Sequence, residues 1–186
     1  MANLILSGST SGSVTLSSPA VSGTTTLTLP TTSGTVLTSA SNTNFPAGSV
    51  LQVVNVTYST ETSNSTSTYA DTGLTASITP SSTSSKILVL VNQAGVGKNT
   101  GNILSAVSVK LLRNSTDICT FAVAVGYNQT SSFNLGFSST TSYLDSPSTT
   151  SSVTYKTQFA NGQNAASVRV QTDSSTSTIT LIEVKG

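Results

Sequence analysis

Apolar and polar residues alternate along the chain after about residue 48, with the period of two that is typical of a half-buried β-strand. Turn residues separate the alternating segments, and no segment shows a helical period of useful length. Thr66–Ala70 and Leu74–Ile78 are weak strand candidates. The strong candidates are Ser49–Tyr58, Lys86–Val91, Ile103–Leu112, Asp117–Val125, Ser132–Phe137, Val153–Phe159, Ala166–Thr172 and Thr178–Val184.

This pattern predicts an all-β domain. Eight or more short strands with polar turns indicate a β-sandwich or a barrel, and we favour a jelly roll of two four-stranded sheets. Lys86–Val91 is nearly all apolar, which predicts a strand covered on both faces. Asp71–Gly73 predicts a turn. Asn92–Thr100 resembles the end of a phosphate-binding loop but lacks its first Gly and its Ser or Thr after the Lys, so we expect a Gly-rich connection there.

The residues before this domain repeat with a period of 11, because Ser-Gly pairs begin at residues 11, 22 and 33. Each unit has a Gly turn and then a short run of Thr, Val and Leu, which fits an extended strand. The runs are Ser13–Leu16, Thr24–Leu29 and Thr35–Leu37. The alternative is a disordered Ser/Thr linker, and disorder until assembly onto a partner stays open.

Repeat units of this kind carry too few large apolar side chains to form a core alone, because stacked neighbours are needed to cover them. We therefore expect several copies of the chain to wind together around a thin apolar axis. A closed cyclic oligomer with a jelly-roll knob suits three-fold packing, so the prediction is a homotrimer. Residues 1–46 would form a β-repeat shaft or attachment segment, and residues 47–186 a jelly-roll-like β-sandwich knob.

Charge is almost absent from the first third of the chain, where the first charged residue is Glu61. Serine and threonine take its place, with 36 Ser and 34 Thr among 186 residues. The charge-free stretch continues through Ser49–Tyr58, beyond the last repeat. We expect this strand to lie beside the shaft, at the three-fold axis, where an unpaired charge would be costly to bury.

The composition also limits the chemistry. No histidine is present, which excludes a Ser–His–Asp triad, a Cys–His pair and a His-ligated metal site. The six carboxylates are spread along the chain, and no spacing indicates a glycosidase pair, although folding could bring two together. We expect no enzyme activity, no metal and no cofactor. Cys119 is the only cysteine, so an internal disulfide is impossible, and we expect it to be a small buried residue.

The basic residues do not cluster, and the net charge is +1. This argues against nucleic acid or an anionic membrane as a partner. No apolar stretch approaches the ~20 residues of a membrane helix, so membrane insertion is not expected. No export signal is visible either, which indicates that the chain is made in a cytoplasm and is not exported by the usual route. We expect Lys98, Lys110 and Arg113 to be solvated.

Four aromatic residues lie within one 17-residue window among Asn, Gln, Ser and Thr. They are Tyr127, Phe133, Phe137 and Tyr143. Aromatic rings stack on sugar faces and amide side chains bond sugar hydroxyls, so this window is a candidate receptor contact for a glycan. The alternative is that these rings pack the core or a subunit interface.

Parts of the chain resemble tail-fibre and other virion structural proteins of tailed phages, especially those that infect cyanobacteria and marine bacteria. GSVTLSSPAVSGTTTLTLPTTSGTVLT resembles their N-terminal repeats. TGLTASITPSSTSSKILVLVNQ, SYLDSPSTTSSVTYKTQF and STSTITLIEVKG look like their C-terminal β-domain. The resemblance implies a homotrimeric fibre or appendage, located on the virion after assembly in the host cytoplasm. It carries no catalytic residues across.

Three functional hypotheses follow. In the first, residues 1–46 attach a trimeric fibre to other virion proteins of the tail or capsid, and the knob binds a host surface glycan or protein. In the second, the chain is a capsid cement, decoration or head-fibre protein that binds the capsid through its N-terminal segment. The third is a glycan-cleaving enzyme, for which Asp117 and Asp145 would be the residues to replace.

Overall fold

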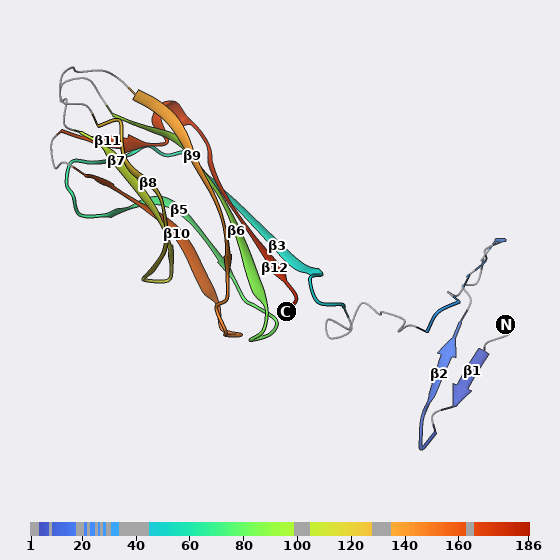
Figure 1. Cartoon of the computed structure of the whole chain (residues 1–186). Helices are drawn as coiled ribbons and strands as arrows, with labels where there is room; N and C mark the ends of the chain where they lie inside the picture. Colours follow the sequence, from blue (N-terminus) through green and yellow to red (C-terminus); the bar gives the residue numbers. More distant parts are fainter. Residues whose placement is uncertain are drawn as a thin grey trace. The chain divides into compact units, whose positions relative to one another are not determined.

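The computed structural model describes residues 4–7, 9–17, 21, 23, 24, 26, 28, 31–33, 45–98, 105–127, 135–162 and 166–186 (Figure 1). The chain divides into two compact units, Met1–Val36 and Leu37–Gly186. Each unit is described by itself below.

The first unit contains a β-hairpin. Strand β1 (Leu4–Ser7) pairs antiparallel with β2 (Ser13–Leu16), and Leu6 lies opposite Val14. The strand predicted at 13–16 is therefore confirmed, whereas β1 was not predicted. In the segment predicted as the second repeat strand, the described residues 24, 26 and 28 are not in a strand, and 35–37 lie outside the described residues.

The second unit is a β-sandwich of antiparallel strands, which confirms the predicted fold class. One sheet contains β5, β10, β7 and β8 in that order, and the other contains β3, β12, β6, β11 and β4, with β9 paired to β6. The strands are β3 (Val50–Tyr58), β4 (Thr62–Asn64), β5 (Ala70–Ile78), β6 (Lys86–Lys98), β7 (Val107–Arg113), β8 (Thr116–Val125), β9 (Leu135–Asp145), β10 (Val153–Asn161), β11 (Val168–Val170) and β12 (Ser177–Val184).

The strand order is that of a jelly roll. β11 and β12 pair one after the other with the same side of β6, so together they fill one strand position. β4 pairs with β11 and β3 pairs with β12, so β3 and β4 also fill one position together. Counted along the chain, the eight positions are β3/β4, β5, β6, β7, β8, β9, β10 and β11/β12. One sheet is then β3/β4, β12/β11, β6 and β9, and the other is β5, β10, β7 and β8. The first position pairs with the last, the second with the seventh, the third with the sixth and the fourth with the fifth, as in a long hairpin rolled into two layers. Figure 1 shows β3, β12, β6 and β9 side by side.

Two apolar clusters fill the space between the sheets. The larger includes Leu74, Ile87, Val89, Leu111 and Tyr155, and the smaller includes Val96, Val109 and Phe159. These side chains alternate with outward polar ones, as a strand with one buried face requires. The period-two pattern in the sequence is therefore the pattern of this core.

A buried polar layer separates the two clusters. On β10, Thr157 lies between Tyr155 of one cluster and Phe159 of the other. The Thr157 hydroxyl donates to Gln93 Oε1 at 2.8 Å and lies 2.6 Å from the Thr72 hydroxyl. Gln93 Nε2 donates in turn to Ser177 Oγ at 3.0 Å. Hydroxyl and amide groups thus connect the two sheets through the core without a charge.

Three local predictions were wrong. Thr66–Ala70 is mostly bend, and only its last residue belongs to a strand. Asp71–Gly73 lies inside β5, where a register shift against β10 forms a bulge instead of a turn. Gly73 has φ +89 and lies against the Tyr58 ring, which leaves no room for a side chain. The predicted Gly-rich connection after Val91 continues as strand β6 up to Lys98, because β9 pairs with it from Ile87 to Lys98, with a register shift between Gln93 and Val96.

Candidate functional site

The four aromatic residues predicted as receptor contacts are not gathered in one described patch. Tyr143, on β9, is half-buried against the larger apolar cluster, and Phe137 packs against the smaller one. Tyr127, just after β8, is 41% exposed. Phe133 lies outside the described residues. Two of the rings are therefore used in core packing, and Tyr127 is the described one that is open to a ligand.

A shallow cavity of about 210 Å³ lies near the start of β9. The cavity is lined by Gly97, Lys98, Leu135, Gly136, Arg169, Thr172 and Asp173. A Cβ added to Gly126, the residue before Tyr127, would meet Leu135 and Lys98, so the backbone at Gly126 borders two of the lining residues. The polar and charged side chains of this lining suit a polar ligand such as a sugar, and the exposed Tyr127 ring follows Gly126 directly in the sequence.

The three basic residues expected to be solvated are less exposed than predicted. Lys98 is 2% exposed, and its Nζ donates to the Ser105 carbonyl at 3.3 Å. Lys110 forms an ion pair with Asp117 at 2.8 Å and lies 4.0 Å above the Tyr69 ring. Arg113 forms an ion pair with Asp145 at 3.0 Å. The expectation for Lys98 is therefore wrong, since the chain folds over its side chain.

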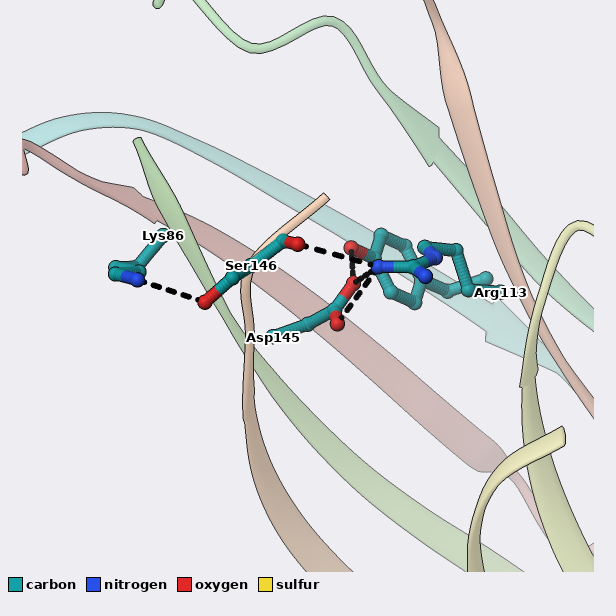
Figure 2. A network of polar contacts seen from close by, with 5 residues as sticks. Lys86, Arg113, Asp145 and Ser146 are labelled. Carbon is teal, nitrogen blue, oxygen red and sulfur yellow. Dashed lines mark hydrogen bonds and ion pairs between the residues drawn. The ribbon is translucent and has the colours of Figure 1, made fainter. Parts of the chain in front are cut away.

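Arg113, Asp145 and Tyr155 form a polar network between the two sheets (Figure 2). Asp145 ends β9, whereas Arg113 and Tyr155 belong to β7 and β10 of the other sheet. Arg113 Nη1 donates to both Asp145 oxygens at 3.0 Å, and the Tyr155 hydroxyl donates to Oδ2 at 2.6 Å. Lys86 Nζ donates to the Ser146 hydroxyl at 2.7 Å. This network fixes β9 against the opposite sheet.

The electrostatics of the network match this linking role. Burial raises the pKa of Tyr155, and the adjacent Asp145 carboxylate raises it further. The hydroxyl therefore stays protonated and remains a donor to Asp145. Tyr155 is fully buried, so its hydroxyl does not reach a ligand from solvent.

Glu183, on β12, is a second buried carboxylate. It accepts hydrogen bonds from the Ser81 amide and hydroxyl at 2.7 Å and from Gln52 Nε2 at 2.6 Å. Burial acts to raise the pKa of Glu183, but the neighbouring donors Ser85, Ser81 and Gln52 outweigh it and hold the pKa below the usual range. The ionised carboxylate thereby fixes the β5–β6 loop to β12.

The outer face of the sheet β3-β12-β6-β9 carries an aliphatic row. Val53 lies opposite Ile182, Ile182 opposite Leu88, and Leu88 opposite Leu144, so four strands each contribute one side chain in register. Val53 and Leu144 are both 58% exposed. Asn55, Thr180, Leu90 and Ser142 form the neighbouring row, followed by Thr57, Thr178, Asn92 and Thr140. Val50, Val184 and Lys86 flank the aliphatic row on its other side.

We call these rows the uncharged face. Every residue in them is uncharged except Lys86, which lies at the margin. Sequence reasoning did not identify this face. The sequence feature that could have indicated this face is the apolar run Lys86–Val91, which was interpreted as a strand covered on both faces. In the single chain, Ile87, Val89 and Val91 are buried, whereas Leu88 is half-buried and Leu90 is exposed. Within the single chain, therefore, only the inner face of this strand is covered, whereas the sequence predicted that both faces would be.

Within the described residues, no group of three or more His, Cys, Asp or Glu side chains lies close enough to hold a metal ion. The described part of the chain also contains no helix long and apolar enough to cross a membrane.

No family model and no curated protein sequence matches the chain. Among solved structures, it is similar to the crystal structure of the infectious bursal disease virus VP2 subviral particle, at 13% sequence identity and a TM-score of 0.43. The match covers 73% of this chain and 33% of that chain, so this chain spans about a third of the viral protein's length. A likeness at this level carries no argument about function or assembly.

Proposed function

We propose that this chain is a non-enzymatic structural protein of a phage virion, and that three copies form a fibre whose β-sandwich binds the host cell surface. Residues 1–46 would form the shaft and attach it to tail or capsid proteins. The proposal draws on the resemblance of the repeats and of the later segments to phage virion proteins, not on the likeness to VP2.

The observation that carries the proposal is the contrast between the N-terminal hairpin of β1 and β2, called the leader hairpin here, and the sandwich. Ile5, Leu6 and Val14 of the leader hairpin are 59%, 54% and 62% exposed, although a two-stranded hairpin is marginal in water by itself. The sandwich, by comparison, closes its own core. A charge-free hairpin with open apolar side chains favours burial against other copies or other virion proteins.

Light scattering of the purified full-length chain tests the oligomer. We expect the mass of three chains of 18.8 kDa each. A stable monomer at high concentration would contradict the fibre proposal. Immunogold labelling of purified virions then tests the location, and label at the tail supports a tail fibre.

The host contact would lie at the cavity lined by Leu135 and Arg169, with the exposed ring of Tyr127 as a further contact. Weak contacts there would be multiplied by three sandwiches per fibre and by many fibres per particle. A glycan array with the full-length chain would identify the ligand, and Tyr127→Ala should remove the signal. Tyr69→Ala is a matched control, since that ring lies over Lys110 instead of the cavity.

A capsid decoration protein is the second candidate. Two of the four predicted contact rings pack into the core, which leaves fewer side chains for a host receptor. A silent glycan array together with binding to purified capsids would favour decoration, as would immunogold label on the capsid.

A further inference from the structure

We propose that the uncharged face is the surface through which copies of this chain pack against one another, with the aliphatic row at its centre. This inference rests on the proposed trimer, and it names the surface that holds the trimer together. The occupant is a second copy of the same β-sandwich.

The aliphatic row resembles one side of a β-sandwich core, with four apolar side chains in register on neighbouring strands and no second layer packed against them in the single chain. Directly opposite residues on neighbouring strands lie about 5 Å apart, so the four side chains form one continuous apolar ridge about 15 Å long. Isolated exposed apolar residues are normal on a protein surface, but a contiguous patch marks an interaction site. The ridge is also regular and rigid, because it stands on paired strands rather than on loops.

The absence of charge selects the kind of partner. Glycans are bound by aromatic rings together with amide groups, and acidic proteins by basic side chains, whereas this face has an aliphatic centre, mostly hydroxyl groups around it and no aromatic ring in its rows. Interface centres are depleted of charged residues, and an uncharged face packs best on another uncharged face. A second copy of this chain, in which 7% of the residues are charged, offers such a charge-poor surface, so neither copy has to bury an unpaired charge.

The size of the face fits an interface between copies. Four strands about 4.8 Å apart and about eight residues of about 3.4 Å each give a footprint of roughly 500 Å² per copy. In a three-fold ring each copy presents this face to a surface of the next copy, and the face and its matching area total about 1,000 Å², which is the lower limit for a specific stable interface. The sequence of β6 agrees, since Leu88 and Leu90 give this strand the composition of one with two covered faces.

Charged substitutions on the face test the proposal. Val53→Asp with Leu144→Asp places two like charges on the aliphatic row in each copy, and sedimentation velocity measures the mass of the full-length chain. We expect the trimer to weaken at least 100-fold and monomer to predominate at micromolar concentration. Val123→Asp is the matched control, because Val123 is 71% exposed on β8 of the other sheet. It should leave the trimer intact.

The outcomes separate this inference from the proposed function. If the wild type is a trimer and the double variant is also a trimer, the uncharged face is not the interface, while the trimeric fibre remains supported. A monomeric wild-type chain would overturn both. If the double Asp variant does not fold, as judged by circular dichroism, Val53→Thr with Leu144→Ser provides the second test. These polar residues suit an exposed strand, and the trimer should still weaken about tenfold, whereas an unchanged trimer would refute the interface.

Discussion

The two outer faces of the β-sandwich are both built from four strand positions, yet they differ in chemistry. The outer face of β5-β10-β7-β8 carries the ion pairs Lys156–Asp71 and Lys110–Asp117. The outer face of β3-β12-β6-β9 carries the aliphatic row and polar uncharged side chains, and the ion pair Arg169–Glu61 belongs to the β11 and β4 end of this sheet. The first face has the composition of a surface exposed to solvent, and the second has the composition expected of the interface proposed above.

The substitution with the largest expected effect on the free energy of unfolding lies between the two sheets, in the network of Arg113, Asp145 and Tyr155 (Figure 2). Asp145→Asn keeps an acceptor for Tyr155 but removes the charge opposite Arg113. We expect a loss of about 2–3 kcal/mol in the free energy of unfolding, below the range for a fully buried pair because Arg113 is partly exposed. Urea denaturation measures it.

Asp117→Asn is the control on the charged outer face. The Asp117 side chain is 57% exposed, so its ion pair with Lys110 is screened by water and the loss should stay within about 1 kcal/mol. Equal losses in the two variants would mean that the network at Asp145 is no more stabilising than a surface ion pair.

The polar layer in the core should give the next largest effect. Thr157→Val keeps the shape of the side chain but leaves Gln93 Oε1 without its donor and the Thr72 hydroxyl without its neighbour. We expect a loss of about 1–2 kcal/mol, measured by urea denaturation. Thr154→Val, on the outer side of the same strand, should change stability by less than about 0.5 kcal/mol. A neutral Thr157→Val would show that the layer contributes no stability.

Acid should weaken the sandwich through Glu183. Its pKa is lowered in the folded chain, so its contribution is complete above the ordinary Glu value of about 4.3 and is lost as the pH falls through the folded value. Thermal unfolding between pH 7 and pH 3 should therefore show a smaller decrease in Tm for Glu183→Gln than for the wild type. Asp71, whose pKa is also lowered although it is exposed, should contribute less, so Asp71→Asn should nearly follow the wild type. Parallel curves for Glu183→Gln and the wild type would contradict this role.

The sequence predicted the elements better than their extent. Val50–Tyr58, Thr116–Val125, Val153–Asn161 and Ser177–Val184 were found almost to the residue, because strict alternation marks a strand with one buried face. Most of β9 was missed, since its stretch Ser138–Ser142 contains only Ser and Thr and is held by pairing with β6. Gly73 looked like a turn because a bulge and a turn use the same backbone conformation.

The candidate site was harder to predict for a related reason. The aliphatic row joins Val53, Leu88, Leu144 and Ile182, and no local pattern connects residues so far apart in the sequence. Only the register between strands places them in one line. The aromatic window had the opposite problem, because Phe137 and Tyr143 are close in sequence but pack against different apolar clusters.

Salt gives the smallest expected effect and the sharpest comparison of the two faces. At about 1 M salt the Debye length falls to about 3 Å, so the exposed ion pairs on β5-β10-β7-β8 are screened. An interface through the uncharged face has no charge pairs to lose, and apolar burial does not weaken with added NaCl. The trimer mass measured by sedimentation should therefore not change between about 0.05 and about 1 M NaCl. Leu144→Lys should dissociate the trimer at low salt and partly restore it at high salt, as repulsion between copies is screened. Dissociation of the wild-type trimer by salt would instead place the interface on charged residues, and the outer face of β5-β10-β7-β8 would be the first to examine.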